Sequence, residues 1–540
     1  MSLGVAAVMK APALLALGGR RVPAGPGDPL LQAWQMAWDA HALLTRPLAV
    51  WDANTFWPLR HSLAFSDSLL GYTPLGVLFG SGPRAALVRY AAVFVLAYAL
   101  AAAGAYLLTR QLGCSRLPAA VAGAGFAFAP WHLSQDAHLA VLSTGAVPLA
   151  LALLARGHGV GARASSRPLR PWCTLAGWLV AAWQLTLGFA VGLPFSYALA
   201  VLTAGGGALI ALGPWQLPGD ASLRRGLLRA DLAGLAVFAA VGVAFALPYY
   251  RVVDEHPEAA RTVSELRFFS PRPSGFLVAP AASTLWGRLD ASARSGLNSS
   301  DEMALDVGAA IIALAGYGLV RGAWSRARRA VLLAAVGALF VLGCGTNLAG
   351  GRFYLLLYHH APGFRGVRTP GRLVILLTLG VALLAAQGAE ALMKGQRGRR
   401  ALGVALVAAV LLDGCGTLPI PAAPNLSEAL AAAADPVLVL PSSFAFDEEP
   451  MWETTAGFKR LVNGGSGFDP ALLLEIRDRT RSFPDAASVD YLRRLGVRSV
   501  VLRTDLATGT PWAEAALRPT DGLGLTVRDL AGERLYDLSP

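Results

Sequence analysis

The stretch AALVRYAAVFVLAYALAAAGAYLL, residues 85–108, carries a single charged side chain, Arg89, among small, apolar and aromatic residues. An α-helix needs about 20 such residues to cross the hydrocarbon of a bilayer, so the stretch predicts a transmembrane helix. The rest of the chain has the same character, because 55% of its 540 residues are hydrophobic and only 15% are charged. This composition excludes an ordinary soluble domain and indicates an integral membrane protein.

Further apolar windows recur along the chain and predict about eleven spans in all, which gives an all-α polytopic bundle over residues 1–418. The first segment, residues 3–18, is short for a span, and no small-residue cleavage site of a signal peptide follows it. The other windows are 117–131, 138–155, 172–190, 192–212, 230–249, 305–322, 330–348, 371–393 and 401–418.

The basic residues test this topology, because loops on the cytoplasmic side collect arginine and lysine. The net charge of +12 is scattered singly and in short groups, which indicates topology signals and not a nucleic-acid surface. The alternation requires a cytoplasmic N-terminus, with residues 19–84, 250–304 and everything after 419 outside. The groups on the inner side are Arg110 and Arg116; Arg156, Arg163, Arg167 and Arg170; Arg224, Arg225 and Arg229; Arg321, Arg326, Arg328 and Arg329; and Lys394, Arg397, Arg399 and Arg400.

The tail, residues 419–540, changes composition and predicts a small extracytoplasmic α/β domain. PVLVLP (436–441) is typical of a strand. YLRRLGVRSVVLR (491–503) predicts a helix, a glycine turn and a strand, and LTVRDLAGERLYDL (525–538) predicts a hairpin that turns at AGE.

The first predicted outer loop holds one acid, Asp28, between a glycine and a proline in GPGDPLLQAWQMAW (25–38). These neighbours predict a turn that directs the carboxylate toward whatever lies above the bundle. Trp34 and Trp38 follow at helical spacing and predict an interfacial helix with an aromatic face. The two rings could anchor that helix among the lipid headgroups or bind substrate.

Five stretches, in order along nearly the whole chain, resemble the GT-C class of membrane glycosyltransferases, and within it a group of uncharacterised bacterial membrane proteins that includes the YfhO-like ones. The resemblance implies a GT-C-like fold, a bacterial cytoplasmic membrane location and a role in the cell envelope. The stretches are GDPLLQAWQMAWDAHALL (27–44), WDANTFWPLRHSLAFSD (51–67), AGAGFAFAPWHLSQDAHLAVL (122–142), HHAPGFRGVRTPGRLVILL (359–377) and FKRLVNGGSGFDP (458–470).

The resemblance also implies a reaction, the transfer of a sugar from a polyprenyl-phosphate donor to a hydroxyl of a lipid or glycan acceptor, with inversion. In GT-C enzymes a first-loop acid acts as the general base, and Asp28 is the matching position. Many members carry two adjacent acids there, or a DxD motif that holds a metal, whereas this chain has one acid. A divalent metal cofactor therefore stays open, and no metal ligands are assigned.

Four further ionisable residues are candidates near the predicted outer face. Asp67 could supply a second catalytic acid, although Ser66–Ser68 fit an N-cap of the following helix equally well. In WHLSQDAHL (131–139), we predict a catalytic role for His138 and substrate binding for Asp136, because ionisable groups near membrane depth tend to be functional. Helix capping, or a metal site completed by His132, is the alternative, and the spacing is not diagnostic.

A carrier phosphate is a natural ligand for arginine, whose planar fork binds two oxygens. Arg365, Arg368 and Arg372, in GFRGVRTPGR (363–372), precede a predicted span and are our phosphate-binding candidates. Snorkelling toward the headgroups is the alternative. A second and less confined group is Arg251, Arg261 and Arg267.

The sequence thus predicts a polyprenyl-phosphate-sugar-dependent glycosyltransferase that works among membrane lipids and binds no nucleic acid. Two rivals remain open. A transporter or lipid flippase would also need arginines at membrane depth, although no internal repeat is visible. A non-catalytic assembly protein is the other rival. In the tail, NGGSGF (463–468) could approach a ligand or shape a covering loop.

Overall fold

A computed structural model describes residues 2–161, 168–212 and 219–538, so that Arg163 and Arg167 of a predicted inner loop lie outside the described residues. The chain forms two compact units. One break between the units falls after residue 418, and residues 12–92 lie in the same unit as the tail. Unit 1 is Met1–Ala11, Val93–Phe245 and Arg261–Leu418, and unit 2 is Pro12–Ala92, Ala246–Ala260 and Pro419–Pro540.

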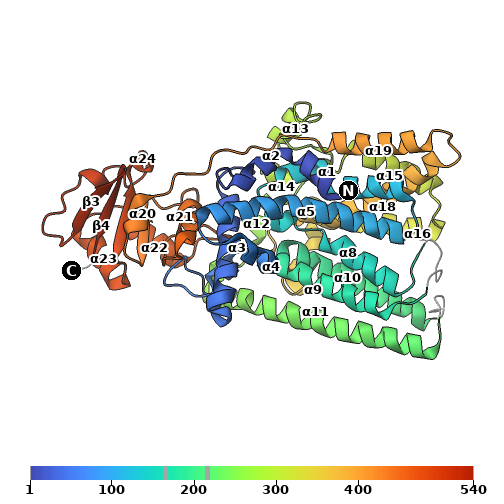
Figure 1. Cartoon of the computed structure of the whole chain (residues 1–540), viewed down its shortest axis with the longest axis horizontal. Helices are drawn as coiled ribbons and strands as arrows, with labels where there is room; N and C mark the ends of the chain where they lie inside the picture. Colours follow the sequence, from blue (N-terminus) through green and yellow to red (C-terminus); the bar gives the residue numbers. More distant parts are fainter. Residues whose placement is uncertain (1, 162–167, 213–218, 539–540) are drawn as a thin grey trace. The chain divides into compact units, whose positions relative to one another are not determined.

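Unit 1 is a bundle whose long helices lie side by side (Figure 1). Two of them, α5 (Pro83–Gln111) and α11 (Ala221–Glu255), also contribute residues to unit 2. The others are α1 Ser2–Met9, α6 Arg116–Ala127, α7 Leu139–Leu142, α8 Ala146–Gly157, α9 Pro171–Leu187, α10 Phe189–Ala211, α12 Val263–Phe268, α13 Ala291–Ser295, α14 Ser300–Met303, α15 Ala309–Arg321, α16 Arg326–Gly343, α17 Arg352–His360, α18 Val374–Met393 and α19 Arg399–Asp413.

Small residues let α15 and α18 pack closely in this bundle. A Cβ added at Gly318 of α15 would lie 2.1 Å from the carbonyl oxygen of Leu384 in α18, and one at Gly388 would lie 2.0 Å from that of Leu314. Glycine is therefore required at both positions for the backbones to approach this closely, which is how helices pack where burial from water supplies little force.

The described residues include five segments long and apolar enough to cross a membrane, which makes the chain a multi-pass membrane protein. They are Pro83–Gln111, Leu139–Gly157, Phe189–Ala211, Ala221–Glu255 and Pro370–Met393. The prediction of about eleven spans is confirmed only to this extent. The remaining windows form helices that are shorter, such as the 13 residues of α15, or charged at one end, such as α16 with its three N-terminal arginines.

The first apolar segment is not a single spanning helix. It forms the eight-residue α1, a four-residue α2 (Ala11–Leu14) and a short 3₁₀ turn. At 1.5 Å per residue α1 is about 12 Å long, far less than the ~30 Å of a hydrocarbon core. Lys10 lies between α1 and α2, and its ammonium group donates to the carboxylate of Asp136. The predicted sidedness of both termini, which counted this crossing, stays a prediction.

Unit 2 holds a four-stranded sheet in the order β1-β2-β4-β3. β1 (Val437–Leu440) is parallel to β2 (Ser499–Arg503), while β4 (Glu533–Asp537) pairs antiparallel with β2 and with β3 (Thr526–Leu530). The predicted hairpin is confirmed, because Ala531 and Gly532 turn with positive φ between β3 and β4. The predicted helix, glycine turn and strand are confirmed as α23 (Ala486–Leu495), Gly496 and β2.

The first loop and the tail share the core of unit 2. Alternate strand residues point to opposite faces of a sheet. Val439 and Val501 pack on one face with Trp34 and Trp38 of α3 (Asp28–Thr45). On the other face, Leu438 and its neighbours pack against α22 and α23. The remaining helices of the unit are α4 Thr73–Gly76, α20 Glu428–Ala432, α21 Glu448–Glu453, α22 Ala471–Arg479 and α24 Thr504–Ala507.

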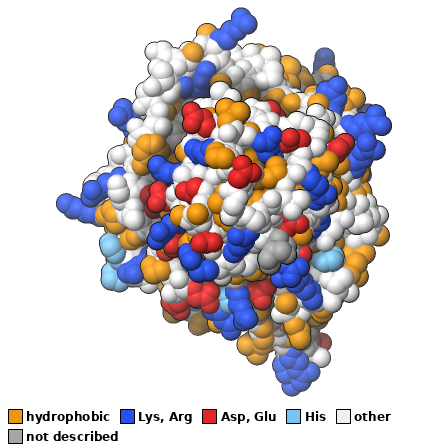
Figure 2. All heavy atoms as spheres, turned by 90° about the vertical axis from the view of Figure 1, so that its left-hand side faces the viewer, with side chains coloured by type: hydrophobic (Ala, Val, Ile, Leu, Met, Phe, Trp, Pro, Cys, Tyr) orange, Lys and Arg blue, Asp and Glu red, His pale blue; other side chains and the backbone are white. Residues whose placement is uncertain are grey.

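The face on which Figure 1 draws β3, β4 and α23 carries acidic and basic side chains interspersed with one another (Figure 2). Neither sign forms a continuous field on this face. Mixed charge of this kind is typical of a water-facing surface.

Candidate functional site

Asp28, the predicted base, is the first residue of α3, and Glu448 is the first residue of α21. The Glu448 carboxyl group is hydrogen-bonded to Asp28. A Cβ added at Gly27 would lie 3.2 Å from Oε2 of Glu448, so glycine leaves room for the second acid beside the first. Asp28 is half-buried, whereas Glu448 is only 4% exposed. We call these two residues the acid pair.

Burial is the main cause that raises the pKa of Glu448 to about 8, and the negative charge of Asp28 adds to it. An acid with this pKa is mostly protonated at neutral pH. Strongly shifted pKa values of this kind mark candidate functional sites, because two adjacent carboxylates rarely both ionise.

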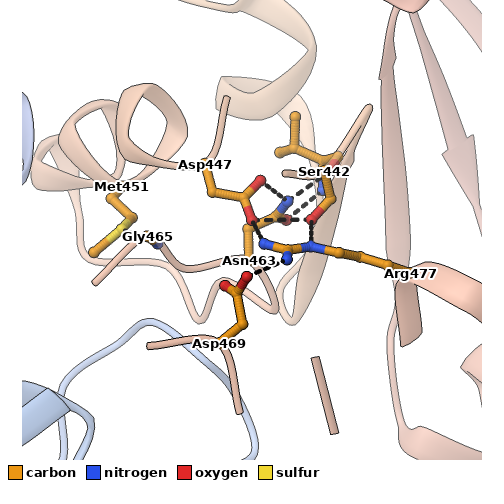
Figure 3. Close-up of polar contacts among 8 residues, drawn as sticks. Ser442, Asp447, Met451, Asn463, Gly465, Asp469 and Arg477 are labelled. Carbon is orange, nitrogen blue, oxygen red and sulfur yellow. Dashed lines mark hydrogen bonds and ion pairs between the residues drawn. The ribbon is translucent and has the colours of Figure 1, made fainter. Parts of the chain in front are cut away.

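A buried polar network holds the start of α21 in place (Figure 3). Oδ2 of Asp447 accepts hydrogen bonds from Oγ of Ser442 at 2.9 Å and Nη2 of Arg477 at 3.0 Å. Oδ1 accepts one from Nδ2 of Asn463 at 2.8 Å, and Asp469 is paired with Arg477 at 3.0 Å. Burial is the largest effect on the pKa of Asp447 and raises it to about 6, against the nearby Arg477. The network fixes the residue just before Glu448.

The glycines of the predicted NGGSGF loop serve packing in unit 2. A Cβ at Gly464 would lie 2.3 Å from the ring of Phe56, and one at Gly465 would lie 2.7 Å from Cγ of Glu448. Asn463 of the same loop bonds to both the N–H and the C=O of Val439 at 2.7 Å. The loop therefore joins β1 to the acid pair by close contacts that larger residues would prevent.

Trp34 and Trp38 lie in the core of unit 2. Trp38 is 0% exposed, and its indole N–H donates to the carbonyl of Val50 at 2.8 Å. The indole N–H of Trp34 donates to Oδ1 of Asn54 at 3.0 Å. Packing against the sheet accounts for both rings, although the sequence pattern had also fitted a substrate-binding face.

Asp67 lies in unit 2 near Tyr249 and Asp39. Its carbonyl accepts a hydrogen bond from Nε2 of Gln35 at 2.9 Å, and its carboxylate and that of Asp39 both act electrostatically on Tyr249. The alternative prediction of an N-cap is wrong, because the 3₁₀ turn at 70–72 and α4 have no side-chain cap. Asp39, in α3, is fully buried with neither carboxylate oxygen hydrogen-bonded to a described residue, and burial raises its pKa.

In unit 1, Glu302 interacts with three residues that the sequence marks as separate candidates. Oε1 of Glu302 accepts from Nη2 of Arg372 at 2.6 Å. Burial alone would raise the pKa of Glu302, but Arg372, then His138 and Arg368, bring it below its usual value. His138 is also held through Nδ1 by the side-chain oxygen of Gln135 at 3.0 Å.

Arg261 joins the same arginines and completes what we call the arginine cluster, Arg261, Arg368 and Arg372. Burial and then the positive charge of Arg368 lower the pKa of Arg261. The guanidinium of Arg368 lies over the ring of Phe269, 5.0 Å from its centroid. Like charges that gather in this way favour an anionic ligand. Arg365 has an exposed side chain and contributes its carbonyl, which accepts from the Arg261 N–H at 3.1 Å.

Asp136 is 5% exposed, and both of its carboxylate oxygens lie 2.8 Å from Nζ of Lys10. The hydroxyl of Tyr98 donates to the same carboxylate. The neighbouring His132 is buried, which lowers its pKa to about 3. Across the described part of the chain, no group of three or more His, Cys, Asp or Glu side chains is arranged to hold a metal ion.

Three residues of these sites are not predicted from the sequence, namely Glu448, Glu302 and Lys10. Glu448 and Glu302 lie in helices of six and four residues, where no apolar period marks a buried face. Lys10 did carry a signal, because a lysine inside an apolar segment needs a partner. Arg261 had been noted only as a member of a looser group.

No protein-family model and no curated protein matches the sequence. Among solved structures, the chain is similar to the archaeal oligosaccharyltransferase AglB from Archaeoglobus fulgidus, in complex with an inhibitory peptide and a dolichol-phosphate, with 13% identity over 100% of this chain and 74% of that one, at a TM-score of 0.43. It is also similar to ArnT from Cupriavidus metallidurans in the apo state, with 14% identity over 99% of this chain and 98% of that one, at a TM-score of 0.36. Likeness at this distance assigns neither an activity nor a catalytic residue.

Proposed function

We propose that the chain is a membrane glycosyltransferase that moves a sugar from a polyprenyl-phosphate donor to an acceptor hydroxyl at the outer face of the bacterial cytoplasmic membrane. The acceptor is a lipid or a glycan. Asp28 takes the proton of the acceptor hydroxyl while the oxygen of that hydroxyl forms a bond to the anomeric carbon of the sugar. The bond from that carbon to the phosphate oxygen breaks, and the lipid phosphate leaves with inversion at the sugar.

The observation that carries this proposal is the acid pair. Asp28 stands at the start of a helix, half-buried, against a buried acid whose pKa is raised to about 8. Burying one carboxyl group beside another is energetically unfavourable. A role in the reaction explains why the chain keeps the pair. Removal of a general base costs roughly 10²–10⁴-fold in rate.

The arginine cluster supports the choice of donor. Three guanidinium groups that act on one another in unit 1 suit a phosphate, and arginine binds phosphate oxygens in pairs. In this proposal Arg368 and Arg372 hold the carrier phosphate with Arg261, and His138 orients the donor through Glu302. Arg365 lies at the edge of the cluster.

The test is turnover in proteoliposomes with labelled undecaprenyl-phosphate sugars, offered singly, and a panel of lipid and glycan acceptors. We expect Asp28→Asn to lower turnover by at least about 10²-fold. Asp39→Asn is the matched control, because Asp39 is the other aspartate of α3 and burial already favours its neutral form. Turnover that is equal in the wild type and Asp28→Asn would remove the assigned base. No turnover with any donor would favour the transporter or assembly protein.

A further inference from the structure

We propose that Glu448 is a positioning residue for Asp28, in which the neutral acid donates a hydrogen bond to the Asp28 carboxylate and holds it ionised and oriented. This inference rests on the proposed function. It makes the C-terminal tail part of the catalytic apparatus, because α21 belongs to the tail and α3 to the first loop.

The geometry is built for a close pair. Two glycines, Gly27 and Gly465, flank the Glu448 side chain, and a Cβ at either would lie 3.2 Å from Oε2 or 2.7 Å from Cγ. While the carboxyl group bonds Asp28, its Oε1 is buried and has no hydrogen-bond partner among the described residues. An ionised carboxylate with a buried, unpartnered oxygen would be strongly disfavoured, whereas a neutral acid with one such oxygen costs far less.

The charges around Glu448 agree with a neutral acid. The charged groups that face it are Asp28 from α3 and Asp447, just before α21, and both raise its pKa. The glycine loop contributes no titratable side chain between Asn463 and Phe468. Two nearby basic residues already have acidic partners, since Arg503 is paired with Glu449 at 2.7 Å and Arg477 with Asp447 at 3.0 Å. No cation therefore appears among the effects on Glu448, and its proton stays on until the pH approaches 8.

This arrangement has a consequence for the reaction. With one proton in the pair, Asp28 is the ionised member and can accept the proton of the acceptor hydroxyl. When Glu448 ionises, two adjacent carboxylates repel each other and the orientation of Asp28 is lost. Turnover should therefore fall as Glu448 loses its proton, even though the base itself stays ionised.

The first experiment measures kcat against pH for the wild type, Glu448→Gln and Glu448→Ala. We expect wild-type kcat to fall above pH 8 by about tenfold per pH unit. Glutamine cannot ionise but can still donate to Asp28, so Glu448→Gln should keep kcat within about threefold at pH 7 and lose the alkaline fall. Alanine cannot donate, and kcat should drop at least about tenfold at every pH. An alkaline fall that persists in Glu448→Gln, or full activity in Glu448→Ala, would overturn the inference.

A second readout does not need turnover. The infrared carbonyl band of protonated carboxyl groups should lose one component as the pH is raised through 8. That component should be absent in Glu448→Gln and should move to lower pH in Asp28→Asn, since the neighbouring negative charge is gone. Glu453→Gln, on the same helix, is the control and should leave it unchanged. A band that Asp28→Asn does not move would show that the two acids do not share a proton.

The two arms separate the proposals. Wild-type turnover with an unaltered alkaline fall in Glu448→Gln overturns the positioning role and leaves the proposed function standing. No turnover with any donor removes the proposed function and the positioning role together. The infrared titration then still decides whether Asp28 and Glu448 form a proton-sharing pair.

Discussion

Nζ of Lys10 lies 2.8 Å from each carboxylate oxygen of Asp136, and both side chains are almost completely buried. Removing one member of such a pair leaves an uncompensated buried charge and costs about 3–5 kcal/mol. We expect Lys10→Met to destabilise unit 1 by about this amount, measured by thermal unfolding in detergent. The double variant Lys10→Met with Asp136→Asn should recover part of the loss. If Asp136→Asn instead raised the donor KM without lowering stability, Asp136 would be a substrate-binding residue.

Trp38 is expected to contribute to stability and not to donor binding. It is fully buried among residues of the sheet and α21, and truncation of a buried tryptophan costs about 3–5 kcal/mol. Trp38→Ala should therefore lower the unfolding midpoint strongly, and Trp38→Phe should lower it less. The donor KM, measured well below the unfolding temperature, should stay unchanged. A raised KM with an unchanged midpoint would contradict the core assignment.

Arg368 and Arg365 allow a matched comparison within one loop. A charge-assisted hydrogen bond contributes about 1.5–3 kcal/mol, so Arg368→Ala should raise the donor KM about tenfold to a hundredfold. Arg365 is exposed, and water and salt screen its charge. Arg365→Ala should change KM by less than about threefold, in line with the small energies of exposed charge pairs. Equal effects of the two substitutions would argue against a specific phosphate site in the arginine cluster.

Stability should depend on pH through Glu453. Burial is the main cause that raises its pKa from 4.5 to about 7. Between these values the folded protein holds a proton that the unfolded chain has released, so stability falls as pH rises through this window and then levels off. At about 1.4 kcal/mol per pH unit, the loss approaches roughly 3 kcal/mol. Glu453→Gln should flatten the unfolding midpoint against pH between 4.5 and 7 by a corresponding amount. An unchanged slope in this variant would rule out Glu453 as its source.

Gly464 should be intolerant of a side chain. Its Cβ would lie 2.3 Å from the Phe56 ring, and overpacking of this kind costs about 1–3 kcal/mol. Gly464→Ala should lower the unfolding midpoint, while Gly457→Ala, with nothing within 4 Å, serves as the control. Lost activity in Gly464→Ala at unchanged stability would point to a loop that contacts a ligand.

Local patterns predicted the parts of the fold that local physics determines. Short apolar runs, the left-handed Gly496 and the Ala531–Gly532 turn indicate the strands and the hairpin, because a short run of apolar residues and a turn's φ are both local features of the chain. Length and hydropathy found the long helices, and five of the roughly eleven predicted spans lie in segments of the described chain long and apolar enough to cross a membrane. An apolar window says that a segment is buried and does not say whether lipid or protein covers it, as α15 packed on α18 illustrates.

For each candidate site, the sequence predicts one member of an interacting pair and does not predict its partner. The resemblance indicates Asp28, phosphate chemistry indicates Arg368 and Arg372, and the rarity of ionisable groups near membrane depth indicates His138. Their partners are not indicated, because the contacts of Asp28 with Glu448 and of Arg372 with Glu302 join segments far apart in the chain. No periodicity or spacing relates such pairs. The lysine at position 10 was the exception, since its place in an apolar segment already required a buried counter-charge.

Trp38 and Leu535 belong to one core, so this core can be completed only after nearly the whole chain has been synthesised. At about 5–20 residues per second, α3 emerges roughly half a minute or longer before β4 exists to complete its surroundings. During that interval two tryptophans are exposed, and chaperones or proteases have access to them. A premature stop codon that removes β4 would therefore destabilise the first loop, which contains α3, as well as the C-terminal sheet.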